Sequence, residues 1–253
     1  MGQLQFKLGF ASVAVIAAVW AGPVVAVDQV QTAKGTLSGT IRDMNPREIS
    51  LERTGGKVEQ IAVNEVLYVR FDGEPPQMNL IRSAALNGRY EDALRDLDKV
   101  AAEAAKIDRD ELKQDIEFYR AYANAQLALA GSADVATAGR QLRDFAQSYP
   151  NSFHSYETSQ VLGDLLAAIG RHDDALAQYA KLAEAPWPDY KMRAAVARGQ
   201  TFARQEMYGN AELEYAAATE IAKTSSGPLV EAQSASASLG LAECQAKNGK
   251  TDE

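Results

Sequence analysis

A ten-residue pattern that recurs after residue 77 constrains the fold of this chain most strongly. Residues 88–97 read GRYEDALRDL, residues 170–179 read GRHDDALAQY, and residues 206–215 hold a looser copy, EMYGNAELEY. Glycine readily adopts the left-handed backbone that ends a helix, and acidic residues are favoured in the first turn of the helix that follows. The pattern therefore predicts a helix, a tight turn and a second helix, used several times.

The same pattern bears on His172, one of two histidines in the chain. Its neighbours, an arginine and two aspartates, are of the kind that could build a catalytic or metal-binding cluster. However, the equivalent position is occupied by Tyr90 in the first copy and by Tyr208 in the third. Since tyrosine would not replace a metal ligand or a catalytic base at each equivalent turn, we expect His172 to pack across its turn.

A small residue marks each copy and sets the length of the repeat. Ala93, Ala138, Ala175 and Ala211 are separated by 45, 37 and 36 residues. This interval resembles that of the tetratricopeptide repeat (TPR) family, whose unit is a helix-turn-helix of about 34 residues. The resemblance implies that residues 77–253 form an all-α solenoid of about four repeats with an incomplete fifth. The matching positions are Leu127, Ala138, Leu142, Phe145 and Pro150 in the second repeat, Leu162, Gly163, Gly170, Ala175, Tyr179 and Pro186 or Pro188 in the third, and Gly199, Phe202, Ala211, Tyr215 and Ala218 in the fourth.

Residues 27–76 show a different periodicity, in which apolar and polar residues alternate. Breaks at Asn45-Pro46 and Gly55-Gly56 divide this stretch into about five short strands joined by tight turns. So few residues favour a small, strongly bent barrel, and the pattern resembles SH3-like or Sm-like domains. Gly73 and Pro75-Pro76 end the strand pattern. The predicted fold is therefore α+β, with a small N-terminal β barrel followed by the TPR-like solenoid.

Residues 1–26 have the order of a secretory signal. A single lysine, Lys7, precedes an apolar run over residues 8–20, and Pro23 stands ahead of small residues that end at Ala26. An uncleaved membrane anchor is the alternative, and only that alternative brings the protein into contact with a membrane. Both readings place the remaining chain outside the cytoplasm. The stretch DFAQSYPNS, residues 144–152, is typical of exported bacterial members of the repeat family, which favours the periplasm or cell envelope of a bacterium.

Charge and composition argue against several other functions. The formal net charge of −8 would repel a phosphate backbone, so we expect no nucleic-acid partner, including the RNA that Sm-like proteins handle. Cys244 is the single cysteine, and His154 and His172 fall in different repeats, so no metal-ligand spacing is present. The glycines fall at repeat turns and no nucleophile elbow surrounds the serines. We therefore expect no catalytic residues, no cofactor and no metal.

A solenoid of paired helices instead presents a concave surface lined by the first helix of each repeat. An acidic strip beside a basic strip could orient a partner there, unless these side chains are only solvated helix faces. The sequence thus favours a non-catalytic exported scaffold or adaptor that binds protein or peptide partners. A small-molecule or glycan-binding module acting through the β domain is the alternative. The predicted groove residues are Glu157, Gln160, Asp164, Arg193, Gln200 and Arg204.

The C-terminal stretch predicts a further turn and the start of another helix. Residues 248–250, Asn-Gly-Lys, match the turn of the repeat, and residues 251–253 match the first residues of the helix after it. An uncovered terminal repeat exposes apolar surface. We expect either a continuation of the chain or a partner that covers this face.

Overall fold

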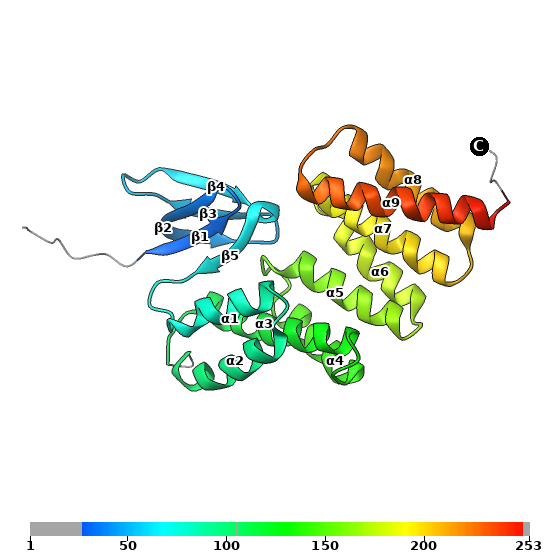
Figure 1. Ribbon diagram of the computed structural model, residues 1–253. Coiled ribbons are helices and arrows are strands. Elements are labelled where there is room, and N and C mark those ends of the chain that lie inside the picture. The colour runs from blue at the N-terminus through cyan, green and yellow to red at the C-terminus, as the bar shows by residue number, and fades with distance from the viewer. Residues whose placement is uncertain (1–26, 105, 250–253) are drawn as a thin grey trace, which may run out of the picture.

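A computed structural model describes residues 27–104 and 106–249, and within them a sheet of five strands precedes nine helices (Figure 1). The predicted α+β class and the order of its two parts are confirmed. The predicted signal segment, residues 1–26, and residues 251–253 lie outside the described residues. The strands are β1 (Asp28–Thr32), β2 (Gly35–Met44), β3 (Glu48–Glu52), β4 (Val58–Ala62) and β5 (Val66–Arg70), with a short 3-10 turn, η1 (Val63–Glu65), before β5. The helices are α1 (Gln77–Leu86), α2 (Tyr90–Ala104), α3 (Asp110–Leu129), α4 (Val135–Ser148), α5 (Ser155–Ala168), α6 (His172–Ala183), α7 (Pro188–Arg204), α8 (Tyr208–Lys223) and α9 (Pro228–Lys247).

The strands form one open antiparallel sheet, so the closed barrel predicted for residues 27–76 is wrong. The strand order is β4-β3-β2-β1-β5, and β4 and β5 remain edges in the part of the chain that is described. The reason lies in β2, where β1 pairs with residues 35–39 and β3 pairs with residues 40–44. The ladder with β1 therefore uses the first half of β2, and the ladder with β3 uses the second half. In a closed barrel, the edge strands β4 and β5 would be hydrogen-bonded to each other. Here β5, which follows β4 through η1, pairs with β1 instead.

The sheet and the first helices share one hydrophobic core. Val30, Ile49 and Val69 are fully buried from the sheet, and they belong to the same cluster as Met78 and Ile81 of α1. Burying these side chains removes apolar surface from water and joins the two parts more tightly than a flexible linker would. The predicted boundary near residue 76 is thus a change of secondary structure within a continuous core.

A buried carboxylate adds a polar connection between the sheet and α3. Asp28 accepts two hydrogen bonds from the Arg109 guanidinium, at 2.7 and 3.0 Å, and also accepts from the backbone N–H groups of Ile41 and Asp72. Such charge-assisted, bidentate hydrogen bonds fix orientation as well as distance. The first strand is therefore held both to its own sheet and to the helical region.

The repeated ten-residue pattern folds as the sequence predicts, with a turn and a helix start. Gly88 and Gly170 adopt positive φ angles of 73° and 77°, and α2 and α6 begin two residues later. In the third copy Glu206 takes this left-handed conformation, at φ 59°. His172 is the first residue of α6, just as Tyr90 is the first residue of α2.

The helices pack in sequence and also in a second, longer-range order. Each helix contacts the next, and α1 contacts α3, α3 contacts α5, α5 contacts α7, and α7 contacts α9. Ala93, Ala138, Ala175 and Ala211 are all buried, which allows neighbouring helices to approach closely. The odd-numbered helices consequently form one continuous layer.

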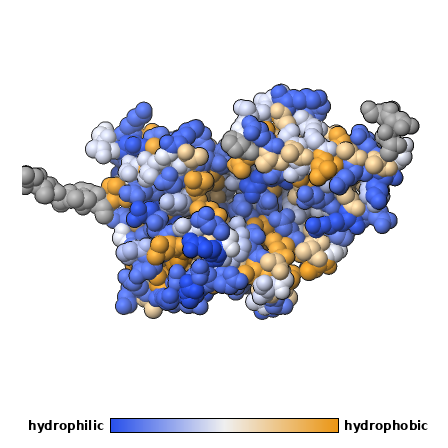
Figure 2. All heavy atoms as spheres, viewed as in Figure 1, coloured by the Kyte–Doolittle hydropathy of each residue, from blue (hydrophilic) through white to orange (hydrophobic). Residues whose placement is uncertain are grey.

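The sheet lies against one end of this layer. Asn64 of η1 donates a hydrogen bond to Asp189 at the start of α7, over 3.2 Å, and Trp187 packs on the core shared by the sheet and α1. Figure 1 shows the sheet beside α1 and α3, with η1 and β5 turned toward the helices. The space-filling view shows a hollow between the sheet and the later helices (Figure 2). On this layer Asp164 of α5 is half-buried, and Gln200 and Arg204 of α7 are exposed.

Candidate functional site

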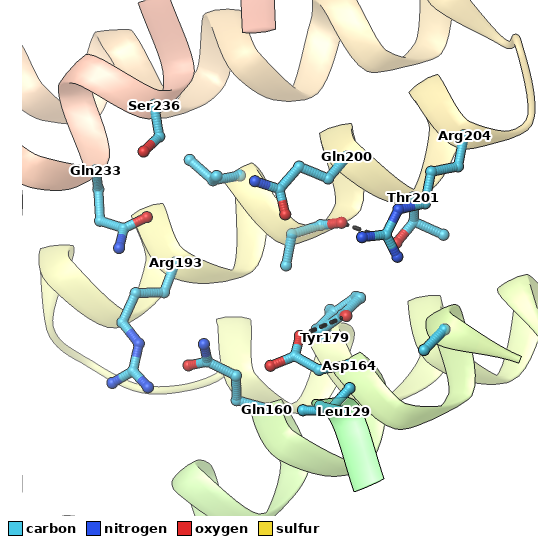
Figure 3. A pocket seen from close by; sticks show the side chains of 13 residues that line it. Leu129, Gln160, Asp164, Tyr179, Arg193, Gln200, Thr201, Arg204, Gln233 and Ser236 are labelled. Atoms are coloured by element: carbon cyan, nitrogen blue, oxygen red, sulfur yellow. Dashed lines mark hydrogen bonds between the residues drawn. The ribbon is translucent and has the colours of Figure 1, made fainter. Parts of the chain in front are cut away.

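A pocket of about 460 Å³ opens on the layer of odd-numbered helices, between α5, α7 and α9 (Figure 3). Its volume falls within the range of small-ligand and side-chain sites in proteins. Most of the polar groups that line it come from α5 and α7, while α3 contributes the side chain at its end. The lining residues are Leu129, Gln160, Asp164, Ala168, Tyr179, Arg193, Val196, Ala197, Gln200, Thr201, Arg204, Gln233 and Ser236.

Helix geometry explains why so many predicted groove residues meet here. Residues three or four apart share one face of a helix, and the contact between α5 and α7 brings two such faces together. Of the six predicted residues, Glu157 is the one that does not line the pocket. The five that do are Gln160, Asp164, Arg193, Gln200 and Arg204.

Glu157 instead forms an ion pair beside the pocket. Its Oε2 atom lies 2.9 Å from Nη2 of Arg193, whose guanidinium carbon also lies 4.8 Å from the centre of the Tyr190 ring. Burial opposes the charge on Arg193, but the Glu157 carboxylate more than offsets this and raises the pKa of the guanidinium. The acidic and basic strips expected from the sequence are therefore partly neutralised by each other across α5 and α7.

Asp164 forms the second internal contact of the pocket. Its Oδ1 atom accepts a hydrogen bond of 2.8 Å from the hydroxyl of Tyr179 on α6. Burial raises the pKa of the Asp164 carboxyl above its ordinary value, although the Tyr179 hydrogen bond acts in the opposite direction. Burial likewise raises the pKa of Tyr179, so the hydroxyl keeps its proton and acts as the donor. One carboxylate oxygen of Asp164 is left for another partner.

Other polar groups of the pocket have no partner within the described residues. The Oε1 atom of Gln160 is buried and accepts no hydrogen bond. Arg204 is exposed, with no ion pair to any described residue, and Gln200 beside it is also exposed. An unpaired buried acceptor costs about 1–3 kcal/mol, so the Gln160 oxygen is a source of instability in the fold. Arg204 and Gln200 are the groups that remain open to a ligand on α7.

Sequence reasoning missed the third wall of the pocket. Gln233 and Ser236 come from α9, and Tyr179 comes from α6, where we expected only a packing role. The signal for the α9 residues was weak, because α9 follows the last copy of the ten-residue pattern, so its register could not be compared with another copy. Their spacing of three residues does place them on one helix face.

A second cluster of polar side chains is buried where the sheet meets the helices. Arg82 of α1 donates to both oxygens of Glu74 at 2.7 Å each and to Asp115 of α3 at 2.7 Å. The other oxygen of Asp115 lies 2.9 Å from Nε2 of His154, whose ring stacks on Phe118. The four polar side chains are between 0% and 8% exposed. These side chains therefore pair chiefly with one another, and the cluster is almost closed to solvent.

The electrostatics of this cluster follow from burial and pairing together. Burial alone would raise the pKa of Asp115, but Arg82 and the hydrogen bond from His154 hold it below its ordinary value. Burial lowers the pKa of His154 below its ordinary value, so the neutral ring donates its Nε2–H to Asp115. Nothing in the spacing of these residues along the chain points to the cluster, because its members come from four separate segments.

The residues most associated with chemistry do not gather elsewhere in the described part of the chain. No three His, Cys, Asp or Glu side chains in residues 27–104 and 106–249 are arranged to hold a metal ion. Cys244 is buried in α9, and burial raises the pKa of its thiol. The candidate site is therefore the pocket between α5, α7 and α9.

Comparison with known proteins adds no assignment to this geometry. No protein-family model matches the chain, and no curated protein matches it. Among the helices that the structure describes, none has both the length and the apolar character needed to cross a membrane. The function must therefore be argued from the fold and the pocket.

Proposed function

We propose that this protein is a non-catalytic scaffold or adaptor, exported to the bacterial cell envelope, whose TPR-type repeats bind a protein or peptide partner. The observation that carries the proposal is the open polar pocket on the layer of odd-numbered helices. Its amide and guanidinium groups are not all used in folding, and groups of this kind recognise polypeptide segments. Export is supported by the composition of residues 1–26 alone.

Two packing contacts support the assignment to TPR-type repeats. The ring of Tyr179 packs on Gly163, and the ring of Tyr215 packs on Gly199, both with a separation of 16 residues. The same contact in two consecutive helical hairpins indicates a repeated unit. Stacked units of this kind leave one face of their first helices accessible to an extended segment.

The role proposed for the sheet is to fix the assembly at one end of this face. Its core residues are buried against α1, and η1 contacts the start of α7. A partner segment would therefore run along the open part of α5, α7 and α9. The sheet would limit how far it extends toward the N-terminal ends of these helices.

A second candidate function is binding of a small molecule or glycan beside the sheet. A pocket of about 360 Å³ lies between β2 and the α4–α5 connection, where Arg42 and Asp43 meet Tyr149 and Phe153. Aromatic and charged side chains together can hold a polar ligand with apolar faces. Because the sheet shares its core with α1, a ligand screen for this pocket requires the whole chain.

Site-resolved photo-cross-linking in the native cells tests the proposed function. A photoreactive amino acid replaces Gln200 in the pocket or, as the control, Gln147 on the exposed face of α4. We expect one protein to cross-link from position 200 and not from position 147, with mass spectrometry identifying the linked segment. The proposal fails if neither position captures a protein, or if both capture the same ones equally.

A further inference from the structure

The charges at the pocket between α5, α7 and α9 cancel. Two carboxylates, Glu157 and Asp164, are balanced by two guanidinium groups, those of Arg193 and Arg204. Glu157 and Arg193 already form an ion pair, with Oε2 2.9 Å from Nη2. Arg204 lies near enough to Asp164 to act on its pKa, in the direction opposite to burial. A ligand group with a charge of either sign would therefore meet a like charge as well as an opposite one. The pocket does not favour a charged group.

After folding, the pocket still contains polar groups that can form hydrogen bonds with a ligand. On the α5 side, Asp164 has one oxygen beyond the one bonded to Tyr179, whereas the Oε1 of Gln160 is buried and presents no accessible surface to the pocket. On the α7 side, the guanidinium of Arg204 and the amide of Gln200 can donate. Figure 3 shows Gln160 and Asp164 on one side of the pocket and Gln200 and Arg204 on the other. Asp164 and Arg204 thus stand on opposite walls of the pocket (Figure 3).

We propose that this pocket is a subsite for an uncharged carboxamide, the side chain of an asparagine or glutamine in a bound polypeptide segment. A carboxamide carries two N–H donors and a carbonyl acceptor on one planar group. Its NH₂ group donates to the second oxygen of Asp164, and its carbonyl accepts from Arg204. This inference rests on the proposed function, since the carboxamide is supplied by the partner segment.

Other side chains match the pocket less well. A lysine would satisfy the acceptors but bring its charge close to Arg204, and a glutamate would bring its charge close to Asp164. A leucine would leave Asp164 and Arg204 without a hydrogen bond from the ligand. Sites built around paired polar groups reject ligands that leave those groups unpaired. Asp164 and Arg204 therefore discriminate among these side chains.

A titration with matched peptides tests the inference on the whole chain. The probes are pentapeptides of alanine with a central Gln, Glu, Lys or Leu, capped by acetyl and N-methylamide groups so that the ends carry no charge. Binding is followed by NMR through the side-chain amide signals of Gln160 and Gln233. The test variants are Asp164→Asn and Arg204→Gln, with Asp144→Asn and Arg89→Gln as matched controls on exposed positions. Circular dichroism verifies that all four variants are folded.

We expect the Gln peptide to shift both amide signals and to bind about tenfold more tightly than the other three peptides. Each test variant should lose about tenfold in affinity for the Gln peptide, as expected for one lost hydrogen bond to a charged or buried group, while the controls bind normally. The inference is overturned if the Glu, Lys or Leu peptide binds as well. It is also overturned if no peptide shifts these signals, or if the test variants bind as the controls do.

This test and the cross-linking experiment separate the two proposals. If position 200 captures a partner but the peptides bind without discrimination, the carboxamide subsite is wrong and the adaptor function stands. If the peptides discriminate but no partner is captured, the pocket selects a carboxamide, the adaptor function is wrong, and a bound polypeptide is not the source of that group.

Discussion

The contact of Tyr215 with two helix backbones gives the most direct test of how the repeats pack. A Cβ atom added at Gly199 of α7 would lie 2.7 Å from Cε1 of the Tyr215 ring and 2.9 Å from two further ring atoms. Gly240 of α9 meets the same ring, so a Cβ there would also collide with it. The ring is therefore held between the backbones of α7 and α9, and it also lines a pocket of about 540 Å³ beside α9.

The expected loss of stability in Gly199→Ala follows from two opposing effects. Overpacking of a rigid ring costs about 1–3 kcal/mol, and the upper part of this range applies because the ring is held by both helices. Replacing glycine by alanine inside a helix returns about 1 kcal/mol. The net decrease in the free energy of unfolding is therefore about 1–2 kcal/mol. For a chain of this size, that corresponds to a Tm lower by about 2–8 °C.

Gly209→Ala is the matched control, because nothing lies within 4 Å of a Cβ added at Gly209 near the start of α8. This variant should be more stable than the wild type by about 0.5 kcal/mol. Urea denaturation of both variants, in the wild-type and Tyr215→Ala backgrounds, measures the coupling between residues 199 and 215. We expect a coupling energy of about 1–3 kcal/mol. The packing argument is refuted if Gly199→Ala stabilises the protein as Gly209→Ala does, or if its effect is the same in both backgrounds.

Three further predictions concern the buried polar contacts between the sheet and the helices. Arg82→Met should lower the free energy of unfolding by about 3–5 kcal/mol in urea denaturation, because two buried carboxylates lose their counter-charge; Arg89→Met on an exposed position should change it by less than about 0.5 kcal/mol. The folded-state pKa of His154 lies below 6.5, its ordinary value, so its contribution to stability is present above that pH and declines as the pH falls toward the folded-state pKa. The urea midpoint measured from about pH 7.5 to about pH 5 should therefore decline less steeply in His154→Gln than in the wild type, and equal slopes would contradict the assignment. Asp28→Asn should weaken the contact with Arg109 and cost about 1–3 kcal/mol, and an unchanged rate of proteolysis in the sheet would show that this pair does not hold it.

Much of the fold could be predicted from short segments of the sequence. The turns at Gly88 and Gly170 and the helix starts after them were predicted, because positive φ and first-turn carboxylates depend on neighbouring residues only. The alternation of apolar residues likewise predicted five strands. The closed barrel was wrong, because whether the edge strands meet depends on which residues of β2 pair with β1 and with β3. Strand pairing of this kind joins separate segments, and no short pattern records it.

Part of the candidate site could likewise be predicted from the sequence, and the rest depended on the tertiary structure. The sequence by itself determined that Gln160 and Asp164 share a face of one helix and that Gln200 and Arg204 share a face of another, since residues four apart lie on the same side of a helix. Only the tertiary structure decided that Glu157 neutralises Arg193, that Tyr179 occupies one oxygen of Asp164, and that α9 closes the pocket. These contacts depend on how the helices pack on one another, which is set by close approach across the whole layer. Periodicity along the chain fixes the face of each helix, whereas packing between helices decides which groups are left for a ligand.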